Sequence, residues 1–206
     1  MDKSGKTHEL ISALMNEARH SMNHGHFEHA VIRLRRCLQL EDEPKNRPTI
    51  LNDLGYCFLK LEWFEDAVRI YTHLLKTDPS DNDLRFFLAS AYASLRWTRD
   101  AIEELRTILA SDSNDALVRH DLALCYRNMG WLKESLKEMK RANAYAMIYG
   151  TREEKEIVKH SLANLEYEIG NGDDDGSKKV LLSLILLMMI NKGRKLRLTK
   201  LTKDQR

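Results

Sequence analysis

The sequence predicts an all-α protein in which helix pairs follow one another along the chain. Gly (9) and Pro (3) together account for 12 of 206 residues, roughly half of their ordinary share, so a turn-rich sandwich or barrel is not expected. Hydrophobic residues make up 43% and charged residues 31%, which excludes wholesale disorder because a disordered chain has too little apolar surface to offset its entropy. The third observation is a repeat, since Trp63, Trp97 and Trp131 recur every 34 residues. A constant period of this length is typical of stacked repeat units.

Further positions share the same interval. The matching columns are Leu54, Leu88 and Leu122; Gly55, Ala89 and Ala123; Phe58, Tyr92 and Tyr126; Asp66, Asp100 and Glu134; and Ala67, Ala101 and Ser135. An offset of 37 residues relates Ala18, Phe27 and Ala30 to Gly55, Phe64 and Ala67, because the first connection is longer. The repeat units are therefore expected at about 11–44, 48–81, 82–115 and 116–149.

Each unit is expected to form two helices, as the second one illustrates. Ile50, Leu54 and Phe58 recur at helical spacing and predict the apolar face of a first helix. A break is expected at Trp63, and Pro79 ends the second helix because proline disfavours helix for the residue before it. The columns of small residues mark the places where two helices approach closely.

The second unit resembles the tetratricopeptide repeat (TPR) family. The residues that carry this resemblance are Leu54-Gly55, Phe58, Phe64, Ala67, Tyr71 and Asp78-Pro79. The third and fourth units keep several of the same positions, whereas the first is degenerate, with Ser21 in place of the usual aromatic residue. The resemblance covers about residues 10–146 and implies a right-handed α-solenoid of about four helix pairs. It also implies a non-catalytic protein–protein interaction module that acts as a scaffold or adaptor.

A further helix is expected at 151–170. Thr151 and Glu154 match a capping box that opens it, and Gly170 is placed to close it. An apolar stripe along one side is formed by Val158, Leu162, Leu165 and Ile169. Because a repeat array needs a terminal helix with a polar outer side, we expect this helix to cap the array.

The remaining residues differ in character from the array. Residues 171–177 form an acidic Gly/Asp linker, and within 180–190 only Ser183 is polar. Residues 178–206 hold nine basic residues and one acidic residue, a net charge of +8, so the rest of the chain carries −6 of the total of +2. We expect an apolar, then basic tail helix that docks onto the groove, a neighbouring copy or an anionic membrane surface. A span needs about 20 apolar residues, so the tail is not expected to cross a bilayer.

Catalytic chemistry has no support in the sequence. Motifs for nucleotide binding or serine hydrolysis are missing, so neither an enzyme nor a cofactor is expected. His20 and His24 lie one helical turn apart beside His26 and His29, and two imidazoles at this spacing can chelate a divalent metal. No HExxH pattern accompanies them, so we expect solvent-facing histidines and no metal site. A metal-binding protein that uses this cluster is kept as an alternative.

The cellular location and the partner class follow from other features. Three cysteines form no CxxC pair, and the N-terminus lacks the apolar core of a signal peptide, so a cytoplasmic protein is expected. Nucleic acid is not an expected partner, because the tryptophans recur with the repeat as packing residues. Acidic neighbours such as Glu62 and Asp66 would also repel phosphate. The expected partner is a protein or peptide.

The partner is expected in the concave groove that the first helix of each pair lines in TPR proteins. Helical spacing predicts the groove side chains to be Met15, Arg19, Met22, Asn52, Tyr56, Leu59, Phe86, Ser90, Leu117, His120, Leu124 and Arg127. Many are apolar for a face that would otherwise meet water, so an amphipathic segment is the expected ligand. Tyr56→Ala and Phe86→Ala are expected to cost little stability. The alternative is a chaperone for secreted or assembly subunits, because Arg85-Phe86-Phe87-Leu88 resembles part of a TPR chaperone of type III secretion.

Overall fold

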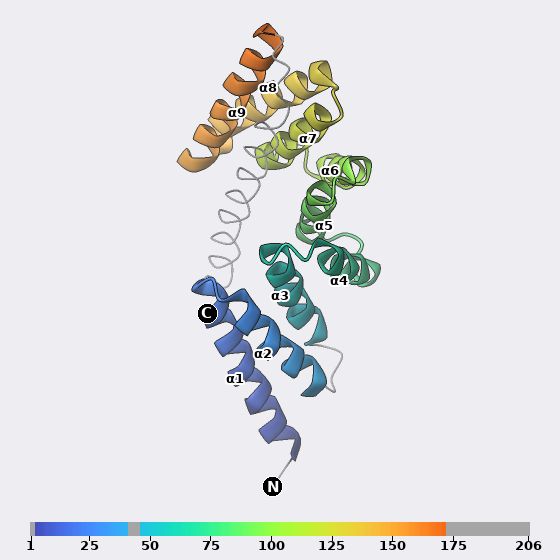
Figure 1. Cartoon of the computed structure of the whole chain (residues 1–206), viewed down its shortest axis with the longest axis vertical. Helices are drawn as coiled ribbons and strands as arrows, with labels where there is room; N and C mark the ends of the chain where they lie inside the picture. The colour runs from blue at the N-terminus through green and yellow to red at the C-terminus, as the bar shows by residue number, and fades with distance from the viewer. Residues whose placement is uncertain (1–2, 41–45, 172–206) are drawn as a thin grey trace. The chain divides into compact units, whose positions relative to one another are not determined.

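The computed structural model describes residues 3–40 and 46–171, and within them the chain forms nine α-helices and no strand (Figure 1). The helices are α1 (Lys3–Asn23), α2 (Phe27–Leu40), α3 (Arg47–Lys60), α4 (Phe64–Thr77), α5 (Asn82–Ser94), α6 (Thr98–Ser111), α7 (Ala116–Asn128), α8 (Leu132–Tyr149) and α9 (Arg152–Asn171). The predicted all-α class is confirmed. The predicted tail, 178–206, and all but the first residue of the linker lie outside the described residues. In the described part, no helix is both long enough and apolar enough to cross a bilayer.

The chain divides into two compact units, and the boundary falls inside the third expected repeat. Unit 1 is Met1–Arg96 and unit 2 is Trp97–Arg206. In unit 1 each helix from α1 to α5 packs against the next, and in unit 2 the same holds from α6 to α9. Within each unit, therefore, consecutive helices build the core, as the helix-pair pattern predicts.

Gly55 shows why the small-residue column exists. A Cβ atom at this position would lie 2.9 Å from Cζ of Tyr71 and 3.0 Å from Cγ2 of Ile70. Any larger residue would therefore push α4 away from α3. The Tyr71 ring occupies the space that the missing side chain of Gly55 leaves open. It stacks on Phe87, with 5.4 Å between ring centroids.

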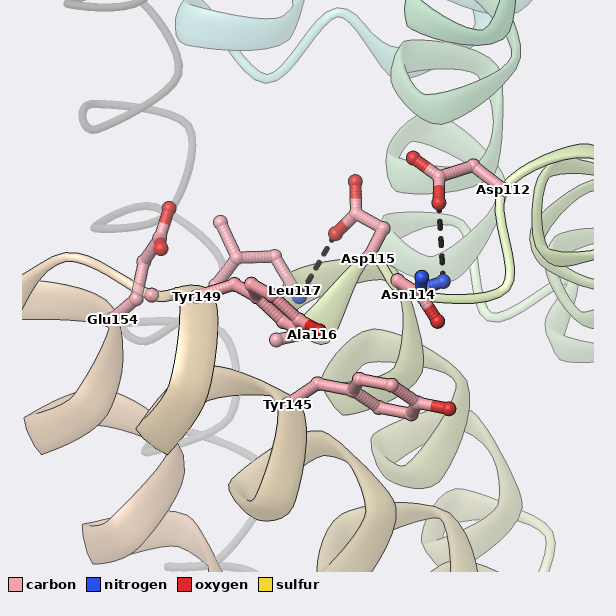
Figure 2. A pocket seen from close by; sticks show the side chains of 9 residues that line it. Asp112, Asn114, Asp115, Ala116, Leu117, Tyr145, Tyr149 and Glu154 are labelled. Atoms are coloured by element: carbon pink, nitrogen blue, oxygen red, sulfur yellow. Dashed lines mark hydrogen bonds between the residues drawn. The ribbon is translucent and has the colours of Figure 1, made fainter.

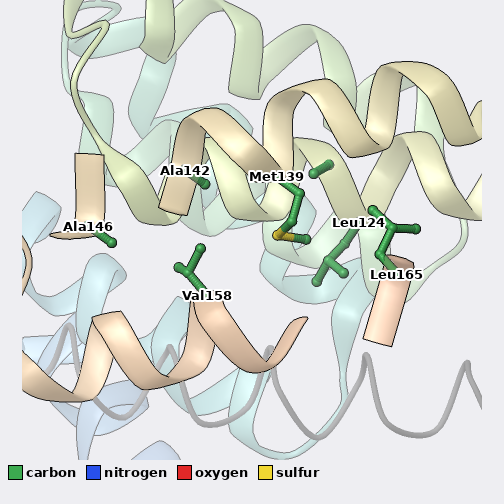
Figure 3. Close-up of a cluster of buried hydrophobic side chains, with 7 residues drawn as sticks. Leu124, Met139, Ala142, Ala146, Val158 and Leu165 are labelled. Atoms are coloured by element: carbon green, nitrogen blue, oxygen red, sulfur yellow. The ribbon is translucent and has the colours of Figure 1, made fainter. Parts of the chain in front are cut away.

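The equivalent contact in unit 2 joins α7 and α8 through a hydrogen bond. The Ser135 hydroxyl donates to the carbonyl oxygen of Ala123 at 2.7 Å, and both residues are fully buried. The core around them contains Ala123, Leu124, Met139, Ala142, Ala146, Val158 and Leu165 (Figure 3). Since Val158 and Leu165 come from α9, this helix is an integral part of the core of unit 2.

Aspartate side chains start two of the first helices in the same way. Oδ1 of Asp81 accepts hydrogen bonds from the backbone N–H groups of the second and third residues after it, at 2.9 and 3.0 Å. Oδ1 of Asp115, 34 residues later, makes the same pair of bonds at the same distances. Such caps satisfy donors at the start of a helix that have no partner within it.

The capping box predicted for α9 is confirmed. The backbone N–H of Thr151 donates to Oε2 of Glu154 at 2.9 Å, and the N–H of Glu154 donates to the Thr151 hydroxyl at 3.2 Å. Gly170, expected to end the helix, lies inside α9, which runs on to Asn171. Lys159, 36 residues after Ala123, is exposed on this helix, although Ala123 is buried against α8.

The turns inside the helix pairs share a left-handed residue. Gly25 and Gly130 have φ angles of +79° and +75°, and the equivalent Glu62 and Arg96 both have +61°. Glycine adopts this conformation without a steric penalty, whereas a side chain makes it costly. The repeat geometry is therefore kept at two positions at the expense of backbone strain.

Candidate partner-binding surfaces

The predicted groove residues of unit 1 fall into two groups. Arg19 is exposed, and Met15, Asn52 and Tyr56 are half-buried. The others are buried, with exposed fractions of 7% for Met22, 8% for Leu59, 2% for Phe86 and 6% for Ser90. The expectation that Phe86 faces an open groove is therefore wrong, and we now expect its truncation to lower stability.

Tyr56 shows how successive helix pairs stack within unit 1. The Tyr56 ring of α3 lies between Phe27 of α2 and Phe87 of α5, with 6.2 Å between ring centroids on either side. Helix α5, the first helix of the next pair, thus contacts the side of α3 that its own partner α4 leaves uncovered. Burial and the neighbouring Cys57 raise the pKa of Tyr56 to about 12, so its hydroxyl remains a hydrogen-bond donor at neutral pH.

In unit 2, α9 contacts three of the four predicted groove residues, His120, Leu124 and Arg127. Leu117, His120 and Leu124 are 5%, 0% and 4% exposed, and Leu124 packs against Val158 and Leu165 of α9 (Figure 3). Arg127 is half-buried, and its Nε donates to Oε2 of Glu168 at 2.6 Å. The expected groove face of α7 is therefore closed by the helix that the sequence predicts as a cap.

A signal for this closure was present in the sequence. The N-cap residues Asp115 and Thr151 are separated by 36 residues, close to the repeat period. The interval places α9 where the first helix of a fifth pair would stand, so it covers α7 as α5 covers part of α3. The stripe of Val158 and Leu165 alone did not reveal which helices it would meet.

Three polar side chains in the α7–α9 contact have the order of a nucleophilic triad. Nε2 of His120 lies 2.9 Å from the Ser161 hydroxyl, and Nδ1 lies 3.0 Å from Oδ1 of Asp121. Nucleophilic catalysis needs a substrate at the serine oxygen, but His120 is fully buried and Ser161 is 7% exposed. These bonds satisfy buried polar atoms and fix α9 on α7.

The inner face of α3 in unit 1 remains accessible and carries polar groups of both signs. Nε of Arg19 lies 3.3 Å from Oδ2 of Asp53, and the Lys60 ammonium lies 5.3 Å from the centroid of the Tyr56 ring. Beside them, Oδ1 of Asn52 is buried and accepts no hydrogen bond from the described part of the chain. A buried amide oxygen left without a donor costs about 1–3 kcal/mol.

The cavities lined by described residues of unit 2 include the following two. One of about 300 Å³ lies between the α6–α7 turn, the end of α8 and the start of α9 (Figure 2). It is lined by Asp112, Asn114, Asp115, Ala116, Leu117, Tyr145, Tyr149, Gly150 and Glu154. The other, of about 430 Å³, is formed by α6, α7 and α8, and there Arg119 pairs with Glu138 at 2.7 Å.

The four histidines lie close together around the α1–α2 turn. The rings of His20 and His24 are 4.2 Å apart between centroids, and His26 and His29 follow at 6.5 and 5.9 Å. Within the part of the chain that the structure describes, no three potential ligands are placed to hold one ion. Nδ1 of His24 is 2.8 Å from the carbonyl oxygen of His20, a contact within one helix.

Comparison with known proteins identifies the repeat and the fold. The tetratricopeptide repeat family model matches residues 48–81, the range of the second expected unit, so the resemblance is confirmed. A MamA double mutant (RS-1) superposes with a TM-score of 0.65 at 17% identity, covering 90% of this chain and 96% of that one. TPR-like repeats of a Podosopora anserina kinesin light chain give 0.63 at 18% identity, covering 86% and 94%. These likenesses concern the fold, and no curated protein matches the sequence.

Proposed function

We propose that the protein is a non-catalytic scaffold that binds a partner segment on the inner face of α1 and α3 in unit 1. The repeat fold supports the class, because tetratricopeptide repeats are protein-interaction modules. The proposed binding residues are Met15, Arg19, Asn52 and Tyr56, the predicted groove residues of unit 1 that keep exposed surface. The covered residues of α5 and α7 act as support.

The unpartnered Oδ1 atom of Asn52 is the observation that carries this proposal. Buried polar atoms are nearly always hydrogen-bonded, and this oxygen lacks a donor in the described residues. A backbone N–H of a docked segment would supply the donor once the Asn52 amide turns outward. The site thus favours a ligand that presents its main chain to α3.

The neighbouring side chains define the chemistry of that segment. Met15 and the ring of Tyr56 offer apolar contact, while Arg19, Asp53 and Lys60 offer charges at the edges. An amphipathic segment satisfies both, because it buries apolar residues in the middle and pairs polar ones at the margin.

A cytoplasmic location is part of the proposal. Cys37, Cys57 and Cys125 are buried and form no disulfide with one another. Burial raises the pKa of Cys125 to about 12, so its thiol stays protonated and unreactive. Reduced, buried cysteines suit a reducing compartment.

The test is a selection of peptides on the full chain. Peptides from a displayed random library are recovered on the wild-type protein, and their affinities are measured by fluorescence anisotropy for Arg19→Ala and Asn52→Ala. The matched controls are Arg36→Ala and Ile32→Ala on α2, two exposed positions. We expect tenfold or greater weakening for the first pair and none for the controls.

Two outcomes would overturn the proposal. One is recovery of peptides whose affinity is insensitive to Arg19 and Asn52. The other is equal weakening by the α2 controls, which would place the binding surface elsewhere. Thermal unfolding followed by circular dichroism establishes that each variant is folded, since the four positions lie outside the buried core.

A further inference from the structure

The cavity beside the α6–α7 turn in unit 2 has a marked negative charge. Asp112, Asp115 and Glu154 line it, and among its described lining residues none is basic. Arg119 lies nearby, 5.3 Å from the centroid of the Tyr145 ring. However, its guanidinium pairs with Glu138 at 2.7 Å and donates to the carbonyl oxygen of Ser113. Three of the described lining residues thus carry a carboxylate.

These carboxylates also have fixed positions. One oxygen of Asp112 accepts from the N–H of Asn114 at 3.0 Å, and Asp115 and Glu154 cap α7 and α9 (Figure 2). A carboxylate that accepts hydrogen bonds from backbone donors keeps its orientation. The carboxylates therefore cannot turn away from one another, and a cation in the cavity would reduce their repulsion.

An apolar surface adjoins the cavity, and this is an independent observation. Met147, Ile148 and Tyr149, the last three residues of α8, are 56%, 68% and 71% exposed. Three consecutive exposed apolar side chains are unusual on a soluble surface and indicate a contact. Tyr149 belongs to both features, since it also lines the cavity.

The C-terminal part of the sequence contains an apolar stretch followed directly by a basic one, which would complement the apolar surface and the acidic cavity. Residues 180–190 are apolar apart from Ser183, and residues 192–206 hold seven basic residues and one acidic residue. The apolar part would cover the end of α8. A lysine or arginine from the basic part would bind the carboxylates with its stem on a tyrosine ring, a favourable cation–π geometry.

The tail is long enough to reach the cavity. From Asn171 back to Glu154 is about 26 Å along α9, at 1.5 Å per residue. The 20 residues 172–191 cover about 30 Å as a helix and about 66 Å when extended. Either length is sufficient for Lys192 and the residues after it to reach the start of α9.

We infer that the basic C-terminal segment, residues 192–206, docks into the cavity lined by Asp112, Asp115 and Glu154, with residues 180–190 against Met147, Ile148 and Tyr149. Because the segment is covalently attached, its effective concentration at the cavity is in the millimolar range, and weak contacts suffice. This inference concerns unit 2 alone and does not depend on the binding surface proposed for unit 1.

The experiment places a nitroxide on the tail of the full chain through Thr199→Cys. The native cysteines are buried, so the label attaches at the new site, and amide line broadening is measured by NMR at low salt. We expect broadening of the amides of Tyr149, Gly150 and Thr151. Added salt should weaken it because the contact is between opposite charges.

The charge test uses substitutions that keep the caps. Asp112→Asn, Asp115→Asn and Glu154→Gln retain the accepting oxygens, since Asn and Gln serve at these cap positions, and should abolish the broadening. The control is Asp78→Asn with Asp81→Asn, which changes the equivalent turn of unit 1. There Oδ1 of Asp78 accepts from the N–H of Ser80 at 3.1 Å. This control should leave the broadening intact.

Three results would overturn the inference. The first is broadening that persists in the triple variant, and the second is no broadening at these amides in the wild type. The third comes from mixing ¹⁵N-labelled protein without nitroxide with unlabelled protein that carries it. Broadening of equal size in that mixture would mean that the tail binds a second copy. Tail binding to anionic vesicles without any cavity contact would appear as the second result.

Discussion

The inner faces of α3 and α7 come from equivalent positions of the repeat and differ in what covers them. Asn52 and Tyr56 on α3 correspond to His120 and Leu124 on α7, 68 residues later. The first two keep exposed surface, whereas the second two are buried beneath α9. In this fold, the availability of a face therefore depends on the helix that follows as much as on the residues of the face itself.

The chemistry of each face matches its neighbour. His120 finds hydrogen-bond partners on both ring nitrogens, one of them from α9. Asn52 leaves its Oδ1 without a donor in the described residues. The polar groups on the face of α7 find their hydrogen-bond partners within the chain, whereas the face of α3 keeps an acceptor without a described donor. We therefore propose that the partner binds at α3.

The largest change in stability is expected at the equivalent position of α5, the first helix of the pair that lies between α3 and α7 in the sequence. Phe86 occupies the position equivalent to Asn52 and His120, and it is 2% exposed. Phe86→Ala should lower the free energy of unfolding by about 3–5 kcal/mol, because it leaves a cavity in a packed core. Urea unfolding measures this, with Asn52→Ala as the control. A loss below about 1 kcal/mol for Phe86→Ala would restore the open-groove assignment.

A smaller loss of stability is expected when the hydrogen bond between His120 of α7 and Ser161 of α9 is removed. Ser161→Ala removes the partner of Nε2 of His120 in a fully buried site. The free energy of unfolding should fall by about 1–3 kcal/mol, the cost of a buried group left unpaired. Hydrogen exchange of the α9 amides should speed up more than that of α6, since α9 is the helix released. Uniform exchange across unit 2 would contradict this.

Substitutions at two left-handed turn positions should change the free energy of unfolding in opposite directions. Glu62 and Gly130 are equivalent, with φ angles of +61° and +75°. Glu62→Gly should raise the free energy of unfolding, and Gly130→Ala should lower it, each by about 1 kcal/mol. Thermal unfolding of the two variants checks the signs. Equal signs would mean that contacts of Glu62 outweigh its backbone strain.

The smallest effects are expected for two ion pairs between first helices. Arg127 and Glu168 are each 17% exposed and 2.6 Å apart, whereas Arg19 and Asp53 are 50% and 19% exposed and 3.3 Å apart. Double-mutant cycles should give a coupling of about 1 kcal/mol for the first and near zero for the second, because water screens the exposed pair. A stronger coupling at Arg19 would show that the open face is more rigid than its exposure indicates.

The repeat pattern was sufficient to predict the fold but not the open surface. The period, the small residue at Gly55 and the capping box at Thr151 depend on local sequence and neighbouring helices, so each follows from spacing alone. The face of a helix that meets water depends on contacts between pairs. Phe86 and Leu124 look unpartnered within one pair, yet both are buried, and Leu124 belongs to a core that α9 completes.

Lys159 has a consequence for assembly. A repeat array has no intrinsic end, because each new pair presents the surface that the next one needs. On α9 the position 36 residues after Ala123 holds an exposed ammonium group, and a helix approaching as closely as α8 approaches α7 would have to strip water from it. Lys159 therefore disfavours a further helix packed on α9 in the way that α8 packs on α7.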